Sequence, residues 1–444
     1  MPGDTFIAIA GEQFDGHDFI EEAINKGATK IICTKFVPCN VEIEIVEDSK
    51  KYLQEYLKNT YSEEIAKLKI IGITGTNGKT TTTYLLYQML MELGVPTACI
   101  GTLGYMAITK ILPLNNTTPD ILTMYELLLQ AKKDGIKVIV MEVSSHSLTQ
   151  QRLYGITLDY GGFTNLTLDH LDYHKTMEAY LQAKVQITKM LKTNGKMVIN
   201  ADDSYHHHFA KKPYISIGKQ AKDFKILRYM YNYPNSHLTM FRHKEYQLEL
   251  PLLGEFNMYN YIMAVAIVND MGYSLEDIFS ISKTLQVPDG RCAIFPLPKG
   301  KAIIDYAHTP DAVLNILTAM KKEVKGKIIT IIGCGGNRDS SKRELIGEIV
   351  TKYSDLVVFT NDNPRHEDPI VIIEQMVAGA KKDNYIIMQE RKQAIQDSIK
   401  IMQENDTLLV LGKGHETYQI IGDKKIGYSD IEEVKKYSIK KERV

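Results

Sequence analysis

The chain has 444 residues, with 53 Lys and Arg residues against 54 Asp and Glu residues and a formal net charge of −1. This balance excludes the basic excess of a dedicated nucleic-acid binder, and no apolar run approaches the roughly 18–20 residues of a membrane span. Its 5 cysteines are widely spaced and form neither a disulfide framework nor a zinc pattern, so we expect a multi-domain cytoplasmic enzyme without nucleic-acid or membrane partners.

The first part of the chain, residues 1–67, has the pattern of a small α/β unit. Its runs are strands at residues 5–10, 29–34 and 41–46, and helices at residues 17–26 and up to Tyr61. The first strand starts almost at Met1, so we expect this unit to be shortened at its N-terminus.

Residues 68–290 form a second predicted unit. A buried strand at 69–74 leads into a Gly-rich loop and a helix, and the run at 137–143 is nearly all apolar, as parallel strands covered on both faces tend to be. Residues 225–250 instead alternate polar with apolar and aromatic side chains, which predicts an antiparallel ribbon. We expect its tyrosines to pack in the sheet rather than stack on nucleic acid: Tyr229, Tyr231 and Tyr233.

From residue 291 to residue 444, strand and helix patterns alternate again. The expected elements are strands at 302–307, 327–333, 355–360 and 406–411, with helices such as 311–323 and 341–353. Such a βαβ series predicts a doubly wound, mostly parallel sheet. The predicted fold class is therefore α/β with three domains: a small α/β N-terminal domain, a central P-loop ATPase domain and a C-terminal Rossmann-like domain.

A Gly-rich loop between a strand and a helix is the strongest chemical signal. Glycines turn backbone N–H groups toward phosphate oxygens, the lysine neutralises the outer phosphates and the following hydroxyl binds Mg²⁺. A strict eight-residue P-loop has Gly where this chain has Ile73, so a Gly-rich structural turn is the alternative. We predict a nucleoside triphosphate site made of Gly75, Thr76, Asn77, Gly78, Lys79, Thr80 and Thr81.

Polar groups that could share the metal follow two later strands. Glu142 ends the strand at 137–143, where carboxylates of open α/β sheets face the ligand crevice. Taken alone, it could equally be a surface carboxylate. Residues 163–174 place two histidines and two aspartates within six positions, a density typical of metal or phosphate chemistry, although some of them could cap a helix.

With these motifs the sequence resembles the Mur ligase family, the amide-forming ligases of bacterial cell-wall synthesis. The stretches that carry the resemblance are GITGTNGKTTT (72–82), NTTPD (116–120), MEVSSHSL (141–148), FTNLTLDHLDYH (163–174), YLQAK (180–184), GEFNMYN (254–260), DYAHTPD (305–311), GCGGNRD (333–339), DNPRHEDP (362–369) and GKGHE (412–416). The resemblance implies that 1–67 recognises the uridine nucleotide, 68–290 binds ATP and 291–444 presents the incoming amino acid. It also implies a monomer that makes peptidoglycan precursors in the cytoplasm.

The reaction that the resemblance implies has two steps. The γ-carboxylate of D-glutamate in UDP-N-acetylmuramoyl-L-Ala-D-Glu attacks the γ-phosphate of ATP, and the amino group of the next residue displaces phosphate from the acyl phosphate. A carboxylate is a poor acyl donor until one of its oxygens becomes phosphate, so the transferring group needs the positive charge of Lys79 and Mg²⁺.

Family roles carry over to matching positions. The resemblance implies Thr80 and Glu142 as metal ligands, His170 as ligand of a second Mg²⁺, and Lys184 as a lysine that CO₂ carbamylates into an anionic oxygen donor. It implies Asn257 and Asn260 beside the adenine, and Arg291 and Asp305 as ATP contacts from the third domain. The implied contacts to the muramoyl-dipeptide are Asn116, Thr117, Thr118, Ser144, Gln150 and Arg152.

The tetrapeptide Asp362-Asn363-Pro364-Arg365 bears on which amino acid is added. In the family, Arg at its fourth position goes with meso-diaminopimelate, whose distal carboxylate a guanidinium can hold by two hydrogen bonds. Matching contacts to this amino acid are Arg338, Gly412 and Glu416. The alternatives are a solvated turn at Arg365, or a ligase that adds L-lysine or another diamino acid.

Two further readings stay open at this point. Folylpolyglutamate synthetase shares the phosphate loop and the modified lysine, but would not be expected to carry DNPR or GKGHE. The other alternative is a nucleotide-binding protein without ligase activity. In the family, a Ser-Arg pair that grips the uridine comes just before the segment found here as Pro2-Gly3-Asp4, and this chain begins after that pair. We therefore name no individual residue as a uridine contact.

Overall fold

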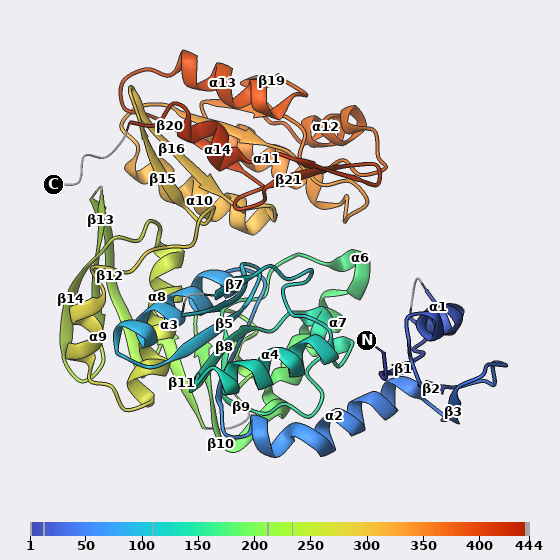
Figure 1. The fold of residues 1–444 in the computed structure, drawn as a ribbon. Helices are drawn as coiled ribbons and strands as arrows, with labels where there is room; N and C mark the ends of the chain where they lie inside the picture. The colour runs from blue at the N-terminus through green and yellow to red at the C-terminus, as the bar shows by residue number, and fades with distance from the viewer. Residues whose placement is uncertain (1, 12–13, 109, 211–212, 233, 440–444) are drawn as a thin grey trace.

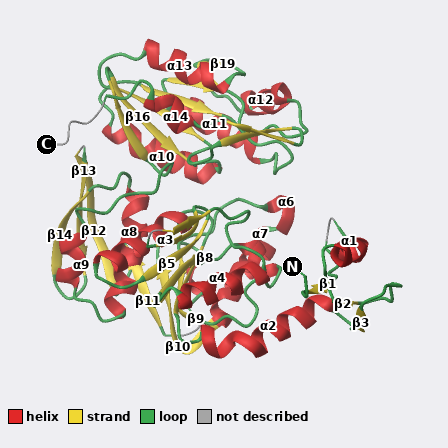
Figure 2. Ribbon diagram, in the orientation of Figure 1, coloured by secondary structure: helices red, strands yellow, loops and turns green. Residues whose placement is uncertain are grey.

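The computed structural model describes residues 2–11, 14–108, 110–210, 213–232 and 234–439. Figure 1 shows them in three parts, each built on its own sheet: a small N-terminal sheet, a large central sheet and a C-terminal sheet. Figure 2 shows helices covering the faces of the central and C-terminal sheets. The α/β class expected from the sequence is confirmed.

The N-terminal part contains a parallel sheet in the order β1-β2-β3. Its elements are β1 (Thr5–Ile7), α1 (Ile20–Asn25), β2 (Lys30–Cys33), β3 (Glu42–Ile45) and α2 (Ser49–Ile65), which runs on to the central sheet (Figure 1). The strand predicted at 5–10 is too long, because the chain turns back after β1 and Ala10 pairs with Asp15. The helix predicted from residue 17 opens as a 3-10 turn, Gly16–Phe19, before α1.

The central sheet has the order β14-β13-β12-β11-β10-β9-β4-β8-β5-β6-β7, with parallel pairing from β12 to β5 and antiparallel strands at both edges. Its strands are β4 (Lys69–Thr74), β5 (Thr97–Gly101), β6 (Gly104–Ala107), β7 (Lys110–Leu112), β8 (Val138–Glu142), β9 (Leu158–Phe163), β10 (Leu191–Asn200), β11 (Tyr214–Gly218), β12 (Phe224–Asn232), β13 (Asn235–Phe241) and β14 (Glu245–Leu250). Its helices are α3 (Lys79–Glu92), α4 (Ile121–Lys133), α5 (Ser145–Thr149), α6 (Leu171–His174), α7 (Met177–Val185), α8 (Glu255–Asp270) and α9 (Leu275–Ile281).

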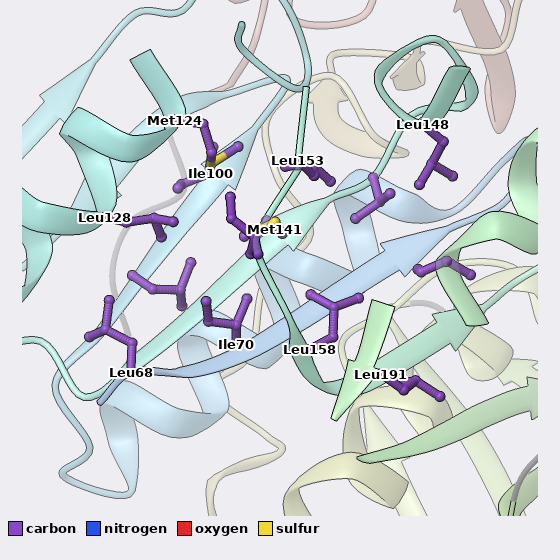
Figure 3. Close-up of a cluster of buried hydrophobic side chains, with 14 of the residues drawn as sticks. Leu68, Ile70, Ile100, Met124, Leu128, Met141, Leu148, Leu153, Leu158 and Leu191 are labelled. Carbon is purple, nitrogen blue, oxygen red and sulfur yellow. The ribbon is translucent and has the colours of Figure 1, made fainter. Parts of the chain in front are cut away.

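The centre of this sheet is buried on both faces, which explains why β4 and β8 read as continuous apolar runs. Figure 3 shows one of the two cores, where Ile70, Met141 and Leu158 from neighbouring strands meet Met124 and Leu128 of α4. The second core lies under α3 and α8. These two cores fix the C-terminal ends of β4 and β8, where the loops with polar residues begin.

The antiparallel ribbon predicted for residues 225–250 is confirmed as β12, β13 and β14. Tyr229 and Tyr231 are partly buried against the apolar cores, as expected for sheet packing. The phenol of Tyr229 also accepts a hydrogen bond from the backbone N–H of Gly254, at 3.1 Å. Tyr233 lies outside the described residues.

The C-terminal sheet has the order β15-β16-β20-β17-β18-β19, parallel except for the β15–β16 pair, and cores line both faces. Its elements are β15 (Ala293–Leu297), β16 (Gly300–Asp305), α10 (Pro310–Glu323), β17 (Ile328–Ile332), α11 (Lys342–Tyr353), β18 (Leu356–Phe359), α12 (Pro369–Ala378), β19 (Tyr385–Ile387), α13 (Arg391–Ile401), β20 (Asp406–Leu411) and α14 (Asp430–Lys435), with a hairpin of β21 (Tyr418–Ile421) and β22 (Lys424–Gly427). This is the doubly wound arrangement predicted from residue 291 onward.

A buried ion pair ties α13 to α14. The Arg391 guanidinium donates to both Asp430 carboxylate oxygens at 2.9 and 2.7 Å, and both side chains have 0% exposure. Arg391 also donates to the Leu411 carbonyl oxygen at 2.8 Å, at the end of β20. We expect Asp430→Asn to lower the free energy of unfolding by about 3–5 kcal/mol, because it leaves a buried guanidinium without its counter-charge.

Urea denaturation followed by circular dichroism measures this loss. The matched control is Asp397→Asn on α13, which removes an exposed ion pair with Lys400 and should leave the unfolding curve almost unchanged. Equal midpoints for the two variants would contradict the prediction.

Candidate active site

The phosphate loop lies between β4 and α3, as predicted. Gly75 and Gly78 have φ of +147° and +87°, values that favour glycine, and a Cβ at Gly78 would collide with the Asn260 side chain. The Lys79 ammonium folds back over the loop and donates to the carbonyl oxygens of Gly75 and Thr76, each at 2.9 Å. Burial lowers the pKa of Lys79. The loop therefore holds a desolvated cation at a helix N-terminus, a typical anion site.

Glu142 and Thr80 meet beside this loop. The Thr80 hydroxyl donates to Glu142 Oε2 at 3.0 Å, and Glu142 is 1% exposed at the end of β8. The backbone N–H of Thr102 donates to Glu142 Oε1 at 2.8 Å. The predicted metal ligands Thr80 and Glu142 are thus adjacent and held in place by a residue that the sequence did not single out.

Lys184 and His170 reach the same region from α7 and from the start of α6. Lys184 is 1% exposed, and its Nζ donates to the Gly75 carbonyl oxygen at 2.8 Å. Burial, and then the nearby Lys79 ammonium, lower the pKa of Lys184 well below its usual value. Desolvation also lowers the pKa of His170 to about 3, against the opposing effect of the Asp169 carboxylate. Lys184 is accordingly a buried amine whose charged form is disfavoured by burial and by the neighbouring Lys79.

No group of three or more His, Cys, Asp or Glu side chains is arranged to hold a metal ion within the residues that the structure describes. The pair of Thr80 and Glu142 still fits Mg²⁺, because Mg²⁺ bound to nucleotides takes one or two protein oxygens and completes its shell with phosphate and water.

Asn257 and Asn260 are buried on α8 directly behind the phosphate loop. Asn260 donates to Asn257 Oδ1 at 3.1 Å and accepts from the Thr82 hydroxyl at 3.2 Å. Asn257 donates to the Leu253 carbonyl oxygen at 2.7 Å. Their position beside Gly78 is suitable for a role in nucleotide binding, and the adenine contact stays a prediction.

The C-terminal part contacts the phosphate loop at several points. Arg291 donates to the Thr80 hydroxyl at 3.2 Å, and Asn77 donates to Asp311 at 3.1 Å. Asp305 is half-buried and accepts from the backbone N–H groups of Cys292 and Ala307, each at 2.7 Å. Asp305 therefore holds the segment that carries Arg291, and its own contact with ATP stays a prediction.

Asp169 connects the two parts electrostatically. Its carboxylate lies 4.0 Å from Lys342 Nζ and 3.9 Å from His308 Nε2, both in the C-terminal part. Burial lowers the pKa of His308 to about 4. The motif around Asp169 does not predict these contacts, because the proximity of Asp169 to Lys342 and His308 depends on how two separate sheets pack.

A cavity of about 940 Å³ opens between the central and C-terminal parts. It collects most of the predicted substrate contacts: Asn116, Thr117, Arg338, Asp362, Asn363, Arg365, Gly412 and Glu416 line it together with His170. The other four predicted contacts do not line the cavity but form a hydrogen-bonded network next to it: Thr118, Ser144, Gln150 and Arg152. Thr118 donates to the Glu142 carbonyl oxygen at 2.8 Å, Arg152 donates to the Thr118 carbonyl oxygen at 2.7 Å and to Gln150 at 2.9 Å, and Ser144 caps α5.

The C-terminal wall of the cavity carries both signs of charge. Arg365 has φ of +53°, and its backbone pairs with the β21 hairpin through hydrogen bonds to Ile420 and from Gly422 at 3.0 and 2.7 Å. Burial and the neighbouring Arg338 cation lower the pKa of Arg365. Burial raises the pKa of Asp362. The cavity wall therefore presents a guanidinium pair beside carboxylates, which suits a ligand with both carboxylate and ammonium groups.

Three family models match successive segments of the chain. The Mur ligase family catalytic domain matches residues 1–64, the Mur ligase middle domain matches residues 73–268, and the Mur ligase glutamate ligase domain matches residues 290–414. The chain belongs to the Mur ligase family. The family expected from its motifs is confirmed, and with it the prediction of a ligase.

Relatives of this Mur ligase span nearly its full length. The UDP-N-acetylmuramoyl-L-alanyl-D-glutamate–2,6-diaminopimelate ligase of Aquifex aeolicus is 42% identical over 438 residues, which cover 98% of this chain and 90% of that protein. A solved structure of a ligase of that name has a TM-score of 0.68 at 29% identity and covers 98% of this chain and 92% of its own.

The fold is shared more widely than the sequence. The MurF ligase of Thermotoga maritima, solved in complex with ADP, has a TM-score of 0.71 at 20% identity and covers 98% of this chain and 94% of its own. Among the described residues of this Mur ligase, every helix is too short or too polar to span a lipid bilayer.

Proposed function

We propose that this Mur ligase joins meso-diaminopimelate to UDP-N-acetylmuramoyl-L-Ala-D-Glu in an ATP-dependent step of peptidoglycan precursor synthesis. The observation that carries the proposal is the cavity between the central and C-terminal parts. His170, which lies beside the phosphate loop, lines this cavity together with the charged residues of the DNPR and GKGHE segments. An acid–amino-acid ligase needs this arrangement, because the activated carboxylate and the incoming amine must meet.

The phosphate loop residues support transfer of the γ-phosphoryl group of ATP to the D-glutamate carboxylate. Lys79 and the loop N–H groups of residues 75–81 bind the phosphates of ATP and balance the charge that builds up during phosphoryl transfer. Thr80 and Glu142 would hold Mg²⁺, which supplies further positive charge when bound. Arg291 reaches the same hydroxyl from the C-terminal part and contributes a further cation.

We assign Lys184 as the site of carbamylation. Its neutral Nζ attacks the carbon of CO₂: a new N–C bond forms, one C=O π bond opens onto oxygen and one proton leaves, so that a neutral amine becomes an anionic carbamate. Burial beside Lys79 supports this assignment, because both features favour the unprotonated amine that can attack CO₂. The carbamate and His170 would hold a second Mg²⁺ near the γ-phosphate.

The C-terminal wall selects the amine donor. Arg365 and Arg338 bind a carboxylate at the far end of meso-diaminopimelate, and Glu416, Asp362 and Asn363 receive an ammonium group. L-lysine has an ammonium group where diaminopimelate has its distal amino acid group, so the guanidinium pair disfavours it. The second candidate is a ligase specific for L-lysine, which would require that Arg338 and Arg365 do not discriminate between L-lysine and diaminopimelate.

The remaining assignments follow the family. Residues 1–67 recognise the uridine nucleotide, residues 68–290 bind ATP and residues 291–444 present the amino acid. Asn116, Thr117 and the network of Thr118, Ser144, Gln150 and Arg152 form the muramoyl-dipeptide side of the cavity. Action as a cytoplasmic monomer is part of the same proposal.

Product mass tests the function directly. The purified chain is incubated with ATP, Mg²⁺, UDP-N-acetylmuramoyl-L-Ala-D-Glu and either meso-diaminopimelate or L-lysine, and a tripeptide product is expected with diaminopimelate. Arg365→Lys should lower kcat/KM for diaminopimelate by about a hundredfold, because a point ammonium cannot replace two parallel N–H donors.

Product with L-lysine alone would keep the ligase and reject the specificity. Absence of product with either amino acid, together with measurable nucleotide binding, would favour the Mur-like protein without ligase activity. Arg365→Lys with unchanged kcat/KM would remove Arg365 from the binding site.

A further inference from the structure

Lys413 is a buried charge that the proposed reaction leaves without a role. Its side chain is 0% exposed within the GKGHE segment that follows β20. Its neighbours Gly412 and Glu416 line the cavity, whereas Lys413 is not among the lining residues. A buried ammonium costs free energy unless it is paired, so its partners indicate what it does.

The Lys413 ammonium donates to two side chains that do line the cavity. Nζ lies 2.8 Å from Glu416 Oε2 and 3.1 Å from Asn363 Oδ1. Asn363 in turn donates from Nδ2 to Glu416 Oε2 at 2.9 Å. The three side chains form a closed triangle of hydrogen bonds. It fixes the orientation of the Asn363 amide, with Nδ2 toward Glu416 and Oδ1 toward Lys413.

Backbone contacts hold this triangle rigidly. The Ile420 N–H of the β21 hairpin donates to Asn363 Oδ1 at 3.0 Å, and the Glu416 N–H donates to the Lys413 carbonyl oxygen at 3.0 Å. The Glu416 carboxylate is therefore preoriented before any ligand enters, which lowers the entropic cost of binding.

The charge of Lys413 matters as much as its hydrogen bonds. Asp362 and Glu416 place two carboxylates close enough for Glu416 to raise the pKa of Asp362, while Lys413 is the first of the cations that oppose this rise. Lys413 compensates one of these negative charges from behind the wall. Asp362 and Glu416 therefore do not act as two uncompensated negative charges on this part of the wall, which suits the binding of a single ammonium group.

We propose that Lys413 is the positioning residue of the diamino-acid site and acts through Glu416 and Asn363 without touching the substrate. This inference rests on the proposed function, since it assigns the ammonium of diaminopimelate to Glu416. It predicts a loss specific to the amino acid, because the phosphate loop lies at the end of the central sheet, whereas the two partners of Lys413 line the C-terminal wall of the cavity.

The test measures steady-state kinetics of the full chain with each substrate varied in turn. Lys413→Met should raise KM for meso-diaminopimelate by about tenfold or more, as expected for the loss of a charged hydrogen bond, while KM for ATP stays within about twofold. Lys413→Gln retains an N–H donor without the charge and should give a smaller rise. Lys424→Met, an exposed lysine of the neighbouring hairpin, is the matched control.

A double-mutant cycle separates action through Glu416 from general damage. In a Glu416→Gln background, Lys413→Met should add almost nothing to KM for diaminopimelate, because the group through which it acts is already neutral. This comparison also serves if the single Lys413→Met variant does not fold, since the double variant leaves no carboxylate at position 416 without its counter-charge.

Unchanged KM for diaminopimelate in folded Lys413→Met would overturn the inference. So would a full additional rise in the Glu416→Gln background, or equal rises in all KM values together with a lower Tm. Failure of the wild-type chain to make tripeptide in the same assay would instead count against the proposed function.

Discussion

Lys184→Ala is expected to abolish nearly all tripeptide synthesis, with a loss of about a thousandfold or more in kcat. Nζ of Lys184 is buried next to the Gly75 carbonyl oxygen, where a carbamate would place an anionic oxygen donor beside the phosphate loop. Alanine would remove the proposed donor and leave His170 alone to hold the proposed second Mg²⁺. The fold should survive, because the variant removes a buried amine whose charged form is disfavoured beside Lys79.

Carbamylation itself is measured by ¹³C NMR after exchange with labelled bicarbonate. A carbamate signal is expected in the wild-type chain and should be missing from Lys184→Ala. The signal should weaken as pH falls through the pKa of Lys184, because protonation removes the lone pair that attacks CO₂. Lys189→Ala, an exposed lysine that follows α7, should keep both signal and activity. Activity of Lys184→Ala above a tenth of the wild-type rate would rule out the assigned role.

Local sequence was sufficient wherever neighbouring residues alone decide the structure. The apolar run before Gly75 could only be a covered strand, and the glycines and Lys79 then define the loop and the helix start. Glu142 could be placed at the ligand edge because parallel strands end there. These predictions needed no knowledge of which sheets pack together.

Long-range packing explains what the sequence did not reveal. Thr102 supports Glu142 from another strand end, and no residue near Thr102 signals that contact. Lys413 belongs to the GKGHE motif, but its proposed role depends on a contact with Asn363, which is 50 residues away in the chain. The contacts of Asp169 with Lys342 and His308 likewise exist only because the C-terminal part closes on the central sheet.

Lys79→Met is expected to lower kcat/KM by about a thousandfold through loss of the cation that faces the transferring phosphoryl group. Without ligand, the ammonium is held by the carbonyl oxygens of Gly75 and Thr76, and burial lowers its pKa. A bound triphosphate replaces these neutral acceptors by anionic oxygens, so the stabilisation of Lys79 is largest when charge builds up on the phosphates. Binding of ATP should weaken less than turnover.

Phosphate release and calorimetric titration of ATP separate these two effects. Lys79→Arg should rescue little, because the loop closes on a compact ammonium and a planar guanidinium cannot donate to both carbonyl oxygens from the same place. Lys133→Met, at the exposed end of α4, is the matched control and should turn over normally. A Lys79→Met variant within tenfold of the wild-type kcat/KM would show that the developing charge is balanced elsewhere, with Arg291 as the first candidate because it already donates to the Thr80 hydroxyl.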